Sequence, residues 1–202
     1  MFNEELIALI PALVLFCFTA AFTPGPNNIL LTLSGAKFGV KRTIPHIFGI
    51  RVGMTVMHIV MLCGLGSLFS MLPILHVALQ AIACGYILYL ASKIIQSGAQ
   101  VNSQVLLQPM SVNQAAVFQL INPKSISMLL SLCSALTIPG ELFWDSAILG
   151  LVVFNLVGIC CAVFWVFAGK YINRYLHKPK QRSRFNIVMA LLLVACLPLI
   201  FI

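Results

Sequence analysis

A stretch of prolines, glycine and asparagines interrupts the first long apolar run of this chain. The run covers residues 6–36, and the interruption is Thr23-Pro24-Gly25-Pro26-Asn27-Asn28. Each proline removes a backbone donor and clashes with the preceding turn, so the carbonyls of Ala20 and Phe22 lose their helical partners. In hydrocarbon, carbonyls of this kind must be satisfied by protein, water or a ligand. We therefore expect an unwound segment here that serves a function.

A second interruption, Asn122-Pro123-Lys124, lies in an apolar run over residues 114–136. A lysine near the middle of a membrane helix costs about 2.5–3.5 kcal/mol on insertion scales, so it needs a partner or a water-filled cavity. The apolar runs contain no Asp or Glu that could pair with it. The acceptors that the sequence offers are the carbonyl of Gln119, the amide of Asn122 and the carboxylate of a ligand. The alternative is a lysine that snorkels to an interface along a kinked helix.

The composition places the chain in a membrane. Apolar residues make up 61% of the 202 positions and charged residues only 8%. A helix of about 20 apolar residues crosses a hydrocarbon core. Four further apolar runs, without interruptions, cover residues 47–69, 72–92, 146–168 and 185–202. Together with the two interrupted runs they predict six membrane helices in an all-α integral membrane protein.

The net charge of +8 follows a pattern that is typical of membrane topology and not of nucleic-acid binding. Outside the predicted helices, lysines and arginines occur only in the segments that follow the first, third and fifth of them, whereas the four acids fall on the other side. Cytoplasmic loops carry such an excess of Lys and Arg. The pattern therefore predicts cytoplasmic loops after helices 1, 3 and 5, with both termini outside the cell.

The two interruptions occupy corresponding places in two halves of the chain. We expect a first membrane repeat at residues 1–92, a cytoplasmic linker at 93–113 and a second repeat at 114–202. Each half has three crossings, an odd number, so the halves enter the membrane from opposite sides. Broken helices 1 and 4 in two inverted repeats indicate a binding site at the midplane, where the repeats meet.

The residues at the breaks match a zwitterionic amino acid. Pro26 and Pro123 suit the first position of a half-helix, and such an N-terminus attracts a carboxylate. The freed carbonyls suit an ammonium group, and asparagine amides both donate and accept. A plain structural kink is the alternative. The candidate substrate-binding residues are Thr23, Pro24, Gly25, Pro26, Asn27, Asn28, Asn122, Pro123 and Lys124.

Two further polar residues and one glycine motif lie in the second predicted helix. His58 is a candidate for proton coupling because histidine exchanges protons near neutral pH; the alternative is a packing histidine bonded across helices. For Arg51 we expect snorkelling to the cytoplasmic interface. Gly49-x-x-x-Gly53 lets backbones approach closely, either within the chain or in a homodimer.

These motifs resemble those of the bacterial lysine-exporter/homoserine-resistance (LysE/RhtB) family of amino-acid exporters. The residues that carry the resemblance are Phe22 to Asn28, Gly49-x-x-x-Gly53 and Asn122-Pro123-Lys124. In addition, the stretch from Asn186 to Val194 near the end of the chain is similar to the cysteine/O-acetylserine exporter branch of the family. The resemblance implies efflux of amino acids across the bacterial inner membrane, driven by the proton gradient. Many relatives carry an acid where this chain has Met54, which leaves His58, Lys124 or a bound water as proton carriers.

The leading hypothesis is a secondary exporter of small neutral amino acids, of the cysteine, O-acetylserine, threonine or homoserine type. The apolar runs hold no carboxylate for a cationic side chain, and Lys124 would repel one. A membrane thiol–disulfide carrier that uses Cys17 and Cys133 is the alternative from another class, and a non-transporting scaffold is a third. The sequence has no phosphate loop, nucleophile elbow or metal-ligand cluster, so we expect no enzymatic activity, no catalytic residues, no metal and no cofactor.

Overall fold

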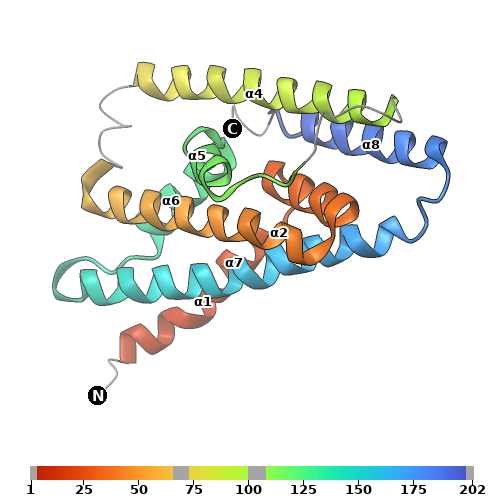
Figure 1. Ribbon diagram of the computed structural model, residues 1–202. Coiled ribbons are helices and arrows are strands. Elements are labelled where there is room, and N and C mark those ends of the chain that lie inside the picture. Colours follow the sequence, from red (N-terminus) through yellow and green to blue (C-terminus); the bar gives the residue numbers. More distant parts are fainter. Residues whose placement is uncertain (1–3, 66–72, 100–107, 199–202) are drawn as a thin grey trace.

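The computed structural model describes residues 4–65, 73–99 and 108–198, and these residues form helices joined by short connections (Figure 1). No strand occurs in these three ranges. In chain order the elements are α1 Glu4–Phe22, α2 Pro26–Val60, a π-helical turn Met61–Leu65, α4 Pro73–Ala99, α5 Val112–Ile121, α6 Pro123–Ala135, a 3-10 turn Gly140–Leu142, α7 Phe143–Asn173 and α8 Pro179–Val194.

Helix boundaries coincide with both proline-containing interruptions. The first helix ends at Phe22, and α2 begins at Pro26, with Gly25 in extended conformation before it (φ −169°, ψ 176°). Helices α5 and α6 are separated by Asn122 and bent by 71°. In both places a proline opens the following helix, where its missing N–H costs nothing because first-turn donors lack intrahelical partners.

Helix α2 consists of two arms that meet at Gly39. This glycine has φ 77° and ψ 176°, a conformation that residues with a Cβ rarely adopt. Figure 1 shows the chain changing direction between the two orange arms of α2. The sequence had suggested a loop between residues 36 and 47, but the structure makes the turn at a single glycine and is helical on both sides of it.

Two other helix boundaries in the structure differ from those predicted from the apolar runs. Helix α4 runs to Ala99, so it takes in the beginning of the expected linker, whose residues 100–107 lie outside the described residues. The last helix starts at Pro179, six positions before the apolar run predicted at 185–202, because the N–H of Lys178 bonds to Oε1 of Gln181 at 2.8 Å. Residues 66–69, 72 and 199–202 of the predicted runs also lie outside the described part.

Three segments of the described chain are long and apolar enough to cross a membrane: Glu4–Phe22, Pro26–Gly64 and Gly140–Asn173. The bent pair α5–α6 makes a fourth if it is one span. Large apolar side chains such as Leu15, Leu156 and Phe164 are exposed on these segments. Such a surface suits hydrocarbon rather than water. An all-helical membrane architecture is thus present, with three to four spans of this kind.

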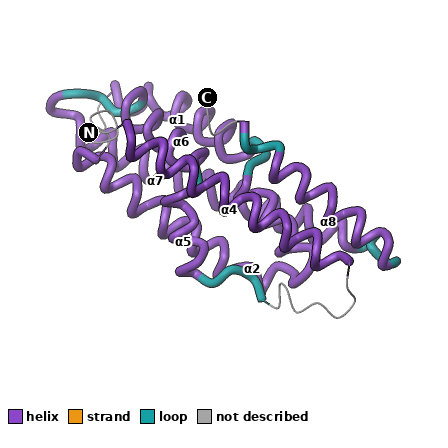
Figure 2. The backbone as a smooth tube through the Cα atoms, turned by 90° about the horizontal axis from the view of Figure 1, so that it is seen from above, coloured by secondary structure: helices purple, strands orange, loops and turns teal. Residues whose placement is uncertain are grey.

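Two apolar cores hold the helices together, and α2 contributes to both. The first core joins α1, α2, α6 and α7 around buried residues such as Leu13, Phe154 and Leu129. The second joins α4 and α8, which lie side by side in both views (Figure 2), to α2 and α5. The site described below lies where α1, α2, α6 and α7 meet.

Glycines allow α2 to approach its neighbours at backbone distance. A Cβ on Gly35 would lie 2.2 Å from the carbonyl oxygen of Val166 in α7, and one on Gly49 would lie 2.4 Å from that of Val112 in α5. A Cβ on Gly53 would lie 2.5 Å from the carbonyl oxygen of Ala116. The motif Gly49-x-x-x-Gly53 therefore packs within the chain, against α5, which decides between the two interpretations left open by the sequence.

Candidate functional site

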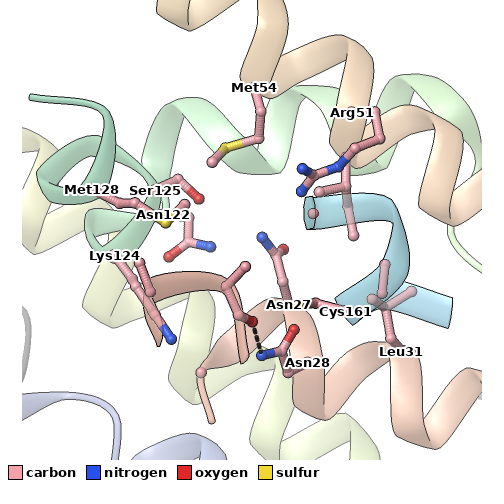
Figure 3. Close-up of a pocket in the computed structure, with 16 residues that line it drawn as sticks. Asn27, Asn28, Leu31, Arg51, Met54, Asn122, Lys124, Ser125, Met128 and Cys161 are labelled. Carbon is pink, nitrogen blue, oxygen red and sulfur yellow. Dashed lines mark hydrogen bonds between the residues drawn. The ribbon is translucent and has the colours of Figure 1, made fainter. Parts of the chain in front are cut away.

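A cavity of about 40 Å³ lies at the meeting point of the two helix interruptions (Figure 3). One water needs about 10–15 Å³ of such volume, so the cavity has room for about three waters. Its walls come from α1, α2, α6, α7 and the two breaks. The lining residues are Ala20, Ala21, Gly25, Asn27, Asn28, Leu31, Ile50, Arg51, Met54, Asn122, Lys124, Ser125, Met128, Gly158, Cys161 and Ala162.

Asn28 stabilises the first break from inside the protein. Its Nδ2 donates to the carbonyl of Ala21 at 2.8 Å and to that of Thr23 at 2.9 Å. The sequence had drawn attention to the carbonyls of Ala20 and Phe22. The extended conformation of Gly25 takes its N–H away from the helical path, which frees the Ala21 carbonyl as well.

Lys124 connects the second break to the first. Its Nζ donates to the carbonyl of Thr23 at 2.5 Å and to that of Pro24 at 3.4 Å. A Cβ on Gly25 would lie 2.8 Å from Cδ of Lys124, so only glycine leaves room for this side chain as it lies here.

Neither of the two protein acceptors expected for Lys124 binds it in this conformation. The carbonyl of Gln119 accepts instead from the N–H of Asn122 at 3.3 Å, and the Asn122 amide makes no bond to Lys124. The bend before α6 turns Lys124, on the first turn of that helix, toward a segment 101 positions earlier in the chain. Lys124 thus binds residues that the fold brings close and not its neighbours in sequence.

A network of amides links the start of α2 to α5. Asn27 and Gln119 donate to each other through their side chains, at 2.7 and 3.2 Å. The Oε1 of Gln119 also accepts from the hydroxyl of Ser125 at 2.9 Å, and its Nε2 donates to the carbonyl of Ala115 at 2.7 Å. Both donors and both acceptor positions of this fully buried amide are therefore used.

Arg51 lies in the cavity wall, and the expectation that it snorkels to an interface is wrong. Its Nε and Nη1 atoms are buried and have no hydrogen-bond partner among the described residues. The guanidinium carbon is 5.3 Å from the ring centroid of Phe154. A Cβ on Gly158 would lie only 1.8 Å from Nη1. This placement could not be predicted from sequence, because Gly158 and Phe154 belong to α7. The one feature of the sequence that pointed to a role for Arg51 was a cation in an apolar run without acids.

The structure brings most of the candidate site residues together. Gly25, Asn27, Asn28, Asn122 and Lys124 line the cavity. Asn122 is buried, and its Oδ1 has no partner among the described residues.

The remaining candidates at the breaks act through the backbone. Thr23 and Pro24 contribute the carbonyls that Lys124 binds. Pro26 and Pro123 are buried and open α2 and α6.

His58 lies apart from the residues that line the cavity. It is 1% exposed, and its Nδ1 is buried without a partner among the described residues. Its ring meets that of Phe154 edge-on, with centroids 6.0 Å apart. The same phenylalanine therefore contacts both Arg51 and His58.

The electrostatics of the lining favour an anionic group. Two cations, Arg51 and Lys124, are present among the lining residues, and none of these residues is an acid. Figure 3 shows the two cations on opposite sides of the cavity, with Asn27 and Asn122 between them. All seven cysteines are free thiols, and Cys161 is the one among the lining residues. The described residues hold no group of His, Cys, Asp and Glu that could bind a metal ion.

Comparison with known proteins gives full-length similarity to one family. The family model described as "LysE type translocator" matches residues 18–197. The chain is 31% identical over 198 residues to the cysteine/O-acetylserine efflux protein of Salmonella typhi, covering 96% of this chain and 97% of that protein. It is 30% identical over 196 residues to the protein of the same name from Escherichia coli (strain K12), with the same coverage. No solved structure matches.

Proposed function

The chain belongs to the LysE-type translocator family, and from this we propose that it exports small neutral amino acids or their derivatives from the cytoplasm. Its similar relatives are named for efflux of cysteine and O-acetylserine, so these two solutes are the first candidates; threonine and homoserine are next. We propose proton antiport as the driving reaction and the bacterial inner membrane as the location. The observation that carries the proposal is the cavity, in which cations and amides but no acids line the meeting point of two broken helices.

The lining matches the two ends of an amino acid. Cationic side chains suit its carboxylate, and main-chain carbonyls with amide oxygens suit its ammonium group. The proposed substrate-binding residues remain those at the breaks. They are Thr23, Pro24, Gly25, Pro26, Asn27, Asn28, Asn122, Pro123 and Lys124.

We propose that the conformation described here is one that does not admit substrate. A cavity with room for about three waters is smaller than cysteine, so entry of the substrate requires the two breaks to separate. The hydrogen bonds from Lys124 to the carbonyls of Thr23 and Pro24 hold them together. In the proposed cycle, Lys124 releases these carbonyls when substrate enters, and the carbonyls become available to the substrate's ammonium group.

We further propose six spans in two inverted repeats, residues 1–92 and 114–202, joined by the linker 93–113. The turn at Gly39 supports this arrangement, since it divides α2 into one arm that follows the first break and one arm that forms the second span. The bend of 71° between α5 and α6 gives the corresponding break in the second half. Both termini then lie outside, and a C-terminal reporter that is active only in the cytoplasm would contradict this topology.

His58 is the proposed residue for proton coupling. Its buried Nδ1 has no partner in the part of the chain that the structure describes, and its ring contacts Phe154, which also contacts the arginine of the cavity. A proton on His58 would therefore add a charge next to the cavity wall. Replacement of His58 by glutamine should uncouple efflux from an imposed pH gradient while exchange of substrate across the membrane continues.

The export of specific amino acids tests the proposed function directly. Cells that express the chain are loaded with dipeptides, and the amino acids that appear in the medium are measured over time. We expect faster release of cysteine, O-acetylserine or another small neutral amino acid than from cells with an empty vector. Equal release of every amino acid in the two strains would contradict the proposal.

A further inference from the structure

We propose that Arg51 is the residue that binds the carboxylate of the transported solute. The inference rests on the proposed function, because it names how that same cavity selects its substrate. Arg51 is not among the residues at the two breaks, and neither its neighbours in sequence nor a motif marks it as a binding residue. The argument comes from its partners in space.

The guanidinium of Arg51 has unused hydrogen-bonding capacity at two of its three nitrogens. Its Nε and Nη1 atoms are buried, and no acceptor for them exists among the described residues. A buried charge without a partner is unfavourable, so the group is expected to bind an anion or water. The cavity beside it is the place from which such a group can come.

Lys124, the other cation of the cavity, is already paired. Its Nζ has the carbonyls of Thr23 and Pro24 as acceptors, at 2.5 and 3.4 Å. A carboxylate that bound Lys124 would have to replace these bonds, whereas one that bound Nε or Nη1 of Arg51 would replace no bond of those atoms in the described structure. In this division of roles, Lys124 closes the site and Arg51 selects the anionic end of the solute.

The surroundings of Arg51 hold its guanidinium in one place. The ring of Phe154 lies 5.3 Å from Cζ, a distance at which cations are attracted to aromatic faces. Gly158 leaves the space that the Nη1 atom occupies, because a Cβ there would lie 1.8 Å from it. A planar fork of donors held in this way suits a carboxylate, which can accept two parallel hydrogen bonds from it.

The consequence is a specific chemical selectivity. The cavity should discriminate strongly between a solute with a carboxylate and the same solute without it, and this discrimination should depend on Arg51. L-cysteine and cysteamine make a matched pair, since cysteamine is cysteine without the carboxyl group. The compound 3-mercaptopropionate keeps the carboxylate and lacks the ammonium group.

Counterflow in proteoliposomes tests the inference without an assumption about the coupling ion. Vesicles with the purified protein are loaded with unlabelled L-cysteine under reducing conditions, and entry of radiolabelled L-cysteine is measured. In Arg51→Met we expect the KM for L-cysteine to rise about tenfold to a hundredfold, as expected for a lost charge-assisted interaction. Inhibition by 3-mercaptopropionate should weaken to a similar degree, and inhibition by cysteamine should not change. Arg51→Lys keeps the positive charge but loses the planar fork of donors. Its KM for L-cysteine should lie between the KM of the wild type and that of Arg51→Met.

A second variant moves Arg51 without replacing it. Gly158→Ala places a methyl group where Nη1 lies, whereas Gly150→Ala on the same helix meets only Leu13 Cδ2 at 3.7 Å, an ordinary contact. Gly158→Ala should therefore reproduce the loss of discrimination seen in Arg51→Met, and Gly150→Ala should behave like the wild type. This pair keeps the test valid if Arg51→Met fails to insert.

The outcomes separate this inference from the function on which it rests. If the wild-type protein shows no counterflow of L-cysteine, the proposed substrate is wrong and the inference falls with it. If the wild type transports L-cysteine and both Arg51→Met and Gly158→Ala keep its KM and its preference over cysteamine, export stands and the role of Arg51 is overturned. In that case the guanidinium is paired by water alone.

Discussion

Asn27 and Gln119, 92 positions apart in the chain, donate hydrogen bonds to each other through their side-chain amides at 2.7 and 3.2 Å. One residue follows the first break and the other precedes the second. The pair therefore fixes the two interruptions relative to each other beside the cavity. Because Gln119 is fully buried and has all its donors and acceptors in use, its loss would leave several polar groups without partners.

We expect Gln119→Ala to lower the stability of the folded protein. An unsatisfied buried polar group costs about 1–3 kcal/mol, and this change affects both Asn27 and the hydroxyl of Ser125. The measurement is thermal unfolding of the purified protein in detergent. Asn113→Ala is the control, since Asn113 is an exposed polar residue of the same helix.

The pairing also predicts non-additive effects of two substitutions. When Asn27 and Gln119 are both replaced by alanine, the destabilisation should be clearly smaller than the sum of the two single effects, because the second change removes a group that the first has already left unpaired. Strictly additive changes in stability would show that the two amides do not depend on each other.

Replacement of Lys124 by methionine should reduce efflux at least about tenfold while the protein still reaches the membrane. Methionine keeps much of the length of the side chain but removes the ammonium group that binds the carbonyls of Thr23 and Pro24, and one lost charge-assisted hydrogen bond is worth about 1.5–3 kcal/mol. Efflux is measured from dipeptide-loaded cells, with protein levels checked by immunoblot. Lys180→Met, at an exposed position near the start of α8, should transport normally. Wild-type efflux from the Lys124 variant would reduce this residue to a structural role.

A continuous helix through the first break should abolish transport. Replacement of both Pro24 and Pro26 by alanine restores two backbone donors and removes the clash with the preceding turn. We expect a stable, membrane-inserted protein that transports poorly, because the carbonyls now bound by Asn28 and Lys124 would return to helical hydrogen bonds. Pro11→Ala removes a proline from the interior of α1, away from the break, and serves as the control. Normal efflux rates in the double variant would exclude the break from the mechanism.

The exported solute should carry no net positive charge. Arg51 and Lys124 both line the cavity, and none of its lining residues is an acid. A cationic side chain of the solute would therefore find no anionic partner there and would lie near two like charges. Expression should protect cells against a toxic load of cysteine or O-acetylserine and leave their sensitivity to the lysine analogue thialysine unchanged. Selective export of lysine or arginine would contradict this prediction.

Short-range chemistry explains why the breaks were predictable from sequence. Pro24, Pro26 and Pro123 act on their own backbone and on the turn before them, so the ends of α1 and α5 follow from residues that are adjacent in the chain. The loop expected between residues 36 and 47 is instead a turn at Gly39 alone with helix on both sides, because a single glycine with positive φ is enough to reverse the chain there.

The sequence by itself determined that this protein is an apolar helical protein, where its helices are interrupted, and to which family it is similar, because apolar content and proline geometry are properties of local segments. Only the tertiary structure decided the partners. Lys124 meets carbonyls 101 and 100 positions away, Gly49 and Gly53 pack on α5 within the chain, and Arg51 enters the cavity because Gly158 of α7 leaves it room. Contacts of this kind depend on which helices lie side by side, and the fold fixes that through the packing of whole apolar faces, which no single segment encodes.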